Sequence, residues 1–120
     1  MKRGTGVYIA DILEAMERVE GFVEGMEPQT LRTDYRTAYA VVKAFEIMGE
    51  AAKHVPDQTR ARCPEVMWRE MAGMRDRLSH MYWDIDLAFA LEAIRERFPI
   101  ERPALERLLA ELDAEADDGS

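Results

Sequence analysis

The segment TDYRTAYAVVKAFEIMGEAAKH, Thr33 to His54, carries the clearest helical pattern in the chain. Its apolar residues recur at steps of three and four, the period of one face of an α-helix. Thr33 or Asp34 can cap the start of this helix, and Pro56 marks its end. A widened apolar face predicts packing against more than one neighbour. The face comprises Tyr35, Ala38, Val42, Phe45, Met48 and Ala52, widened by Tyr39, Val41 and Ile47.

Four other segments repeat the helical period: about Val7–Met26, Pro64–Met81, Ile85–Phe98 and Ala104–Leu112. A polar stretch, residues 57–64, has room for one helical turn, and no segment alternates with the period of two that a β-strand needs. The sequence therefore predicts an all-α, up-and-down bundle of about five helices. We expect one domain over residues 1–113, followed by a disordered acidic tail at residues 114–120.

The composition is that of a globular protein, with 48% hydrophobic and 33% charged residues. No apolar run approaches the roughly 20 residues that cross a bilayer. Asp11 and Glu14 occur too early for a secretory signal. The single Cys63 excludes an intrachain disulfide and is compatible with a reducing compartment. We therefore expect a cytoplasmic protein without a membrane partner.

The net charge of −8 argues against broad attraction to nucleic acid, and we expect no DNA partner. The charge is uneven, however. Residues 53–80 hold six Lys or Arg against four Asp or Glu, a balance of +2 that leaves −10 for the remainder. Both histidines, His54 and His80, lie in this segment. Any anion site should therefore be local and should lie here.

Common catalytic signatures are absent from the sequence: it has no glycine-rich phosphate loop, no GxSxG, no HExxH and no cysteine pair. Glu46 and Glu50 are spaced like carboxylates of a two-metal site, but no Glu-x-x-His accompanies them. Solvated charges account for this pair. We expect neither a metal nor a cofactor.

The segment RDRLSHMY, Arg75 to Tyr82, holds the residues best suited to chemistry. A histidine can move the proton of a ribose 2′-hydroxyl, and an arginine can bind the phosphate and stabilise its developing charge. Arg75 and His80 are separated by about 140° around an ideal helix, so they do not share a face. Asp76 and His80 do share one, and Asp76 could fix the imidazole tautomer. From the spacing alone, an ordinary surface helix end is the favoured alternative.

Three stretches together resemble the HepT-like proteins of the HEPN superfamily, over about residues 7–112. Arg75–Tyr82 fits the R-x4-H-x-Y pattern, and AFEIMGEAAKHVP, Ala44–Pro56, resembles the second-helix signature. CPEVMWREMAGMRDRLSHMYWDID, Cys63–Asp86, resembles the proline–tryptophan start, the arginine–histidine helix and the acidic start of the next helix.

The resemblance implies a helical bundle that dimerises, as a homodimer or a higher assembly built from dimers. Two arginine–histidine sets would then face one cleft at the interface, so the site need not close within one helix. It also implies a ribonuclease toxin acting on RNA, paired in a type VII-like system with an MNT-type nucleotidyltransferase antitoxin. By this resemblance Arg75 and His80 are catalytic, and Tyr82 is the acceptor of AMP. Arg77 is a supporting phosphate contact, with a surface salt bridge as its alternative.

One position departs from the family pattern, because Asp76 stands where asparagine is frequent. Aspartate adds negative charge beside the phosphate site and should raise the proton affinity of His80. This favours a general-acid role for His80 or weakens RNA binding. The alternative function is therefore a non-catalytic nucleotide- or partner-binding subunit of a minimal nucleotidyltransferase, with Tyr82 as the AMP acceptor. A plain helical dimerisation domain is the third reading.

Overall fold

The computed structural model describes residues 4–78 and 83–118, with only the backbone of Arg75, of residues 83–86 and of Asp118. This part of the chain is helical and contains no strand, which confirms the all-α prediction. Two of its helices, α2 and α4, are short, and α4 is the predicted single turn. The helices are α1 (Thr5–Val23), α2 (Pro28–Thr33), α3 (Tyr35–Lys53), α4 (Asp57–Arg60), α5 (Trp68–Leu78), α6 (Trp83–Glu96) and α7 (Phe98–Asp118).

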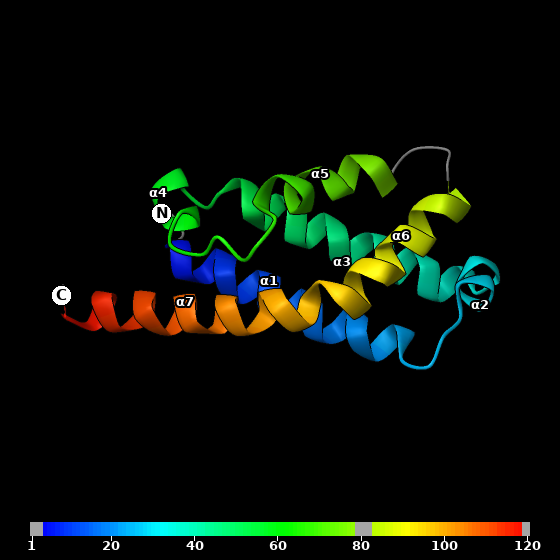
Figure 1. Ribbon diagram of the computed structural model, residues 1–120, viewed down its shortest axis with the longest axis horizontal. Helices are drawn as coiled ribbons and strands as arrows, with labels where there is room; N and C mark the ends of the chain where they lie inside the picture. The colour runs from blue at the N-terminus through cyan, green and yellow to red at the C-terminus, as the bar shows by residue number, and fades with distance from the viewer. Residues whose placement is uncertain (1–3, 79–82, 119–120) are drawn as a thin grey trace.

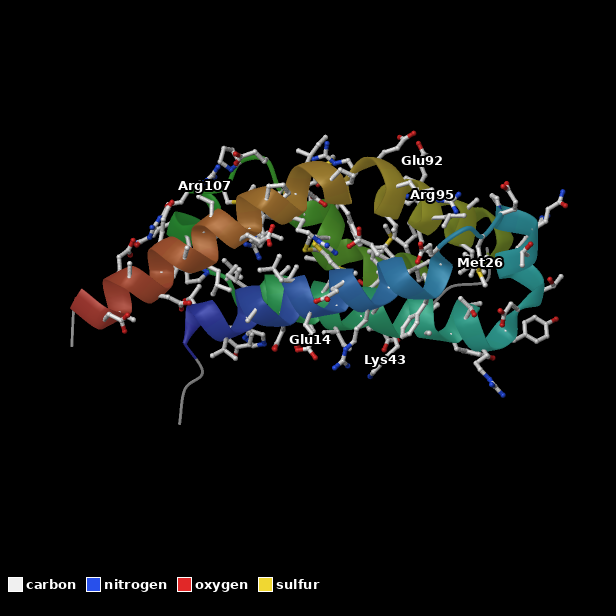
Figure 2. The ribbon with its side chains drawn as sticks, turned by 90° about the horizontal axis from the view of Figure 1, so that it is seen from below. Glu14, Met26, Lys43, Glu92, Arg95 and Arg107 are labelled. Atoms are coloured by element: carbon white, nitrogen blue, oxygen red, sulfur yellow. The ribbon has the colours of Figure 1, made fainter. Side chains whose placement is uncertain are left out.

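The long helices form an elongated bundle of 50 × 25 × 24 Å. The chain direction alternates between α1, α3 and α5, and it returns through α6 and α7 (Figure 1). Helix α6 crosses obliquely from the end of α5 toward the line of α7. Arg95 of α6 donates a hydrogen bond to the carbonyl oxygen of Met26, just beyond α1 (Figure 2). The up-and-down arrangement agrees with the prediction.

Helix α3 lies between α1 and α5 and packs on both, as its wide apolar face predicts. Asp34 caps it by accepting a hydrogen bond from the Thr37 backbone N–H at 3.2 Å. The aromatic residues of its first turns differ from the prediction, since Tyr35 and Tyr39 are 67% and 68% exposed. Val41, which was predicted on the same widened face, is fully buried, and Tyr39 lies about 160° from it around the helix.

Helix α7 is longer than the sequence pattern predicts. It begins at Phe98, includes Pro103 and continues to Asp118, so residues 114–118 are helical where a disordered tail was expected. Leu105 and Leu108 are fully buried, which holds the helix on the bundle despite the proline. The guanidinium of Arg62 donates to Glu115 at 3.0 Å and forms an ion pair with Glu111 at 3.4 Å. These charged contacts anchor the last turns.

Candidate active site

Helix α5 carries the predicted motif at its C-terminal end. The backbone of Arg75 is helical, and Asp76 and Arg77 are exposed on the last turn. His80, Tyr82 and the side chain of Arg75 lie outside the described residues. The arrangement of Arg75 with His80, and the tautomer contact from Asp76, therefore stay predictions. What the structure defines is how α5 is held.

Gly49 allows α5 to approach α3 closely. A Cβ atom at Gly49 would lie 3.1 Å from the carbonyl oxygen of Met71 and 3.2 Å from that of Ala72. Both oxygens belong to the backbone of α5, so they cannot move aside like a side-chain tip. The glycine of the quoted GEAAK stretch thus fixes the distance between the central helix and the motif helix.

Glu101 holds the start of α5. Its Oε2 accepts a hydrogen bond of 2.9 Å from the backbone N–H of Met67, the residue before the helix begins. A carboxylate there complements the positive end of the helix dipole. Glu101 is only 4% exposed, and its burial raises the pKa of the carboxyl, while the Met67 hydrogen bond and Arg97 act in the opposite direction. Arg97 approaches Oε2 to 3.9 Å.

Arg60 and Trp68 join the end of α3 to the start of α5. Arg60 donates from Nη2 to the Ala52 carbonyl at 2.7 Å and from Nε to the Val55 carbonyl at 3.0 Å. Its guanidinium lies 5.9 Å from the ring centroid of Trp68. The indole Nε1–H of Trp68 donates to the Cys63 carbonyl at 3.0 Å. Trp68 is buried, which agrees with the anchoring role that the sequence suggests for it.

The far end of α5 is tied to α6 by a cation–π contact. The guanidinium carbon of Arg77 lies 3.8 Å from the ring centroid of Phe89. Phe89 is 38% exposed. Sequence reasoning offered a phosphate contact or a salt bridge for Arg77 and did not identify Phe89 or Glu101. A large apolar residue outside the inward face of α6 was the only signal for Phe89.

His54, the other histidine, has a structural environment. It caps the C-terminus of α3, its ring stacks on Tyr8 at a centroid distance of 4.7 Å, and Nε2 lies 3.5 Å from Glu50. Within residues 4–78 and 83–118, no three His, Cys, Asp or Glu side chains form a group suited to a metal ion. No helix in that part of the chain is long and apolar enough to span a membrane.

Comparison with known proteins identifies the family. The model of a family described as "Ribonuclease HepT-like" matches residues 12–112. A protein of Thermococcus cleftensis named "Probable ribonuclease HepT" is 38% identical over 108 residues, covering 90% of this chain and 98% of that protein. A Methanocaldococcus jannaschii protein named "Putative RNase MJ1216" is 31% identical over 112 residues, 93% of each chain.

A third relative, "Putative RNase TTE0752" of Caldanaerobacter subterraneus, is 34% identical over 92 residues, covering 77% of this chain and 82% of its own. No solved structure gives a significant match. The family match spans most of the bundle, including the central helix, the motif helix α5 and the start of α7. The chain therefore belongs to the HepT-like ribonuclease family.

Proposed function

We propose that this protein is an endoribonuclease that cleaves RNA without a metal ion. The observation that carries the proposal is an R-x4-H-x-Y motif, starting at Arg75 on helix α5, in a chain of the HepT-like ribonuclease family. Arg75 binds the scissile phosphate, and His80 acts as the general acid and base. RNA is the substrate because the chemistry uses the ribose 2′-hydroxyl, which DNA lacks.

The reaction is an internal transfer. A neutral imidazole takes the proton of the 2′-hydroxyl, the 2′-oxygen bonds to phosphorus, and the bond from phosphorus to the 5′-oxygen breaks. An imidazolium gives a proton to the departing 5′-oxygen. The products are a 2′,3′-cyclic phosphate and a 5′-hydroxyl end. Arg75 stabilises the extra negative charge on the phosphoryl oxygens while five oxygens surround the phosphorus.

The working unit in this proposal is a homodimer. Arg75 and His80 are about 140° apart around an ideal helix, so a single helix does not bring both to one phosphate. Two copies that face each other across a cleft supply complementary arginine and histidine groups. One histidine can then act as the base while the other acts as the acid.

The test is cleavage of a labelled single-stranded RNA by the purified protein in EDTA, beside Arg75→Ala and His80→Ala. We expect each variant to lose at least about a hundredfold in rate, the usual contribution of a positioned acid–base group. Lys43→Ala, an exposed cation on α3, is the matched control and should cleave normally. Circular dichroism and sedimentation must show an intact fold and assembly. Loss of wild-type cleavage in EDTA, or equal cleavage by all variants, would contradict the mechanism.

We further propose that the protein acts in the cytoplasm as the toxin of a type VII-like pair, with an MNT-type nucleotidyltransferase as antitoxin. Transfer of AMP to Tyr82 would block the site beside His80. Incubation with such an enzyme and ATP should add the mass of one AMP to the wild-type protein and none to Tyr82→Phe. A modified Tyr82→Phe protein would exclude this acceptor.

The second candidate is a non-catalytic nucleotide- or partner-binding subunit. The net charge of −8 and the exposed Asp76 at the end of α5 favour it, because both oppose RNA binding. Asp76→Asn separates the two candidates. If the ribonuclease proposal holds, this variant should bind RNA more tightly. If the protein is only a partner-binding subunit, neither protein should cleave above the His80→Ala level.

A further inference from the structure

Two tyrosines lie exposed on the first turns of α3. Tyr35 and Tyr39 are 67% and 68% exposed, more than any other large hydrophobic side chain among the described residues. They are four positions apart, so they lie one turn apart on the same side of the helix, with their Cβ atoms about 6 Å from each other. Neighbouring aromatic rings in water are typical of a binding surface. We call this pair the tyrosine platform.

The segment around the platform carries little negative charge. Asp34 is the only acidic residue between positions 28 and 45, in a chain with 24 Asp and Glu residues. Its carboxylate caps α3 by accepting hydrogen bonds from the Thr37 N–H at 3.2 Å and from the Thr37 hydroxyl at 2.8 Å. Arg36 is exposed about 60° from Tyr39 around the helix. An anion therefore meets a cation here, with little of the repulsion that a net charge of −8 creates elsewhere.

The platform lies at the end of the bundle that carries the motif. Helices α3 and α5 run in opposite directions, so the start of α3 and the end of α5 lie at the same end (Figure 1). The close approach of Gly49 to Met71 and Ala72 aligns the two helices along the bundle. From there, Tyr39 is about 15 Å away along α3, and Leu78 is about 9 Å away along α5. The platform is thus about one turn beyond Leu78, in the direction in which the motif continues.

Two exposed rings beside a cation match the parts of a single RNA strand. Aromatic side chains stack on the flat faces of bases whatever their sequence, and cations contact the phosphates of the same strand. Protein interfaces also use tyrosine and arginine, but the scarcity of acidic residues and the position near the motif favour RNA. Resting on the proposed ribonuclease function, we propose that Tyr35 and Tyr39 stack on bases of the substrate strand outside the cleaved bond, and that Arg36 contacts a phosphate of that strand.

The test measures binding separately from cleavage. The parent is the His80→Ala protein, which should bind a fluorescent single-stranded RNA without cutting it, and fluorescence anisotropy gives the Kd. Tyr35→Leu and Tyr39→Leu should each raise the Kd about tenfold, because each removes a stacking face and retains an apolar side chain. Tyr35→Phe keeps the ring and should bind within about twofold of the parent. Arg36→Gln should weaken binding and flatten its salt dependence by about 0.7 in the log–log slope.

Two controls separate stacking and local charge from general damage. A strand of the same length without bases should bind the parent and both leucine variants equally, because it offers nothing to stack. Arg69→Gln removes the same charge from an exposed position at the other end of α5, and it should bind RNA like the parent. Sedimentation of every variant reports whether its assembly is unchanged.

Several outcomes would overturn the proposal. They are unchanged affinity in the leucine variants, an equal loss on the strand without bases, and no RNA binding by the parent. If the leucine variants instead dissociate the protein and lose RNA only in proportion, the tyrosines contact a second copy and the proposal fails as well. Wild-type protein that fails to cleave while the parent shows the expected binding pattern would defeat the ribonuclease proposal alone.

Discussion

The two sides of helix α5 are built differently. Toward α3, the carbonyl oxygens of Met71 and Ala72 come within 3.1–3.2 Å of the Cβ position of Gly49, so backbone meets backbone. Toward α6, Met74 and Phe89 border a groove of about 90 Å³. One neighbour therefore fixes the position of the motif helix, and the other leaves space beside it. Close packing and open space therefore lie beside the same helix.

The largest effect is expected where α5 packs against α3. Gly49→Val should destabilise the protein by about 3 kcal/mol, because overpacking against a backbone cannot be relieved by a rotamer change. Urea unfolding followed by circular dichroism measures the change. The matched variant is Gly73→Val on α5, where the Cβ position has no described atom within 4 Å. That variant should unfold within about 0.5 kcal/mol of the wild type. Equal losses at both positions would show that the close contact at Gly49 has no special weight.

A smaller effect is expected at Glu101, at the start of α5. Glu101→Ala should cost about 2 kcal/mol, because the Met67 N–H loses a buried acceptor and Arg97 loses its carboxylate neighbour. Glu101→Gln keeps an acceptor and should cost less. If the two variants were equally stable, the hydrogen bond to Met67 would not be the cause of the lost stability.

The pH dependence at Glu101 has a definite sign. Burial raises the pKa of this carboxyl above the ordinary 4.5, so the folded protein holds the proton more tightly than the unfolded chain. The resulting stability is fully present below pH 4.5 and is lost as the pH rises through the raised value. Wild-type protein should therefore lose stability relative to Glu101→Gln over that interval. Asp34 and Glu65 have lowered pKa values and the opposite sign, but both occur in each protein and cancel in the comparison.

The smallest effect is expected at Gly73, which lies on the exposed surface of α5. Gly73→Ala should stabilise the protein by about 0.5–1 kcal/mol, because alanine favours the helix and meets no described atom within 4 Å. Thermal unfolding would detect it as a higher Tm. A lower Tm would mean that a contact beyond the described residues, such as a second copy, occupies this position.

Much of the fold follows from local patterns in the sequence. The spacing of Phe45 and Met48 predicts the inner face of α3, and both are buried. Asp34 is predicted as a cap and accepts the Thr37 N–H. The length of α7 was missed, because local rules place a break at Pro103 and ignore the anchoring of Arg62 on Glu115.

The candidate site was predictable in part. The motif from Arg75 to Tyr82 is contiguous, so its pattern is visible in the sequence, and the family match agrees with it. The groups that hold α5 are not visible in that way. Glu101 accepts a hydrogen bond from Met67, which is 34 positions away in the sequence. Phe89 contacts the guanidinium of Arg77 only after α6 folds back beside α5. Long-range contacts of this kind depend on the packed bundle and leave no local signature.

Arg60 makes the end of α3 and the start of α5 depend on each other. Its guanidinium donates hydrogen bonds to the carbonyl oxygens of Ala52 and Val55, at and just beyond the C-terminus of α3. The same guanidinium also lies against Trp68, the first residue of α5. Local opening of either end would remove contacts from the other, so the two ends should open as one cooperative unit. Amide hydrogen exchange at Ala52 and at the first turns of α5 would then proceed at matched rates. The side chain of Arg60 thus adds a polar link between the central helix and the motif helix to their close backbone contact at Gly49.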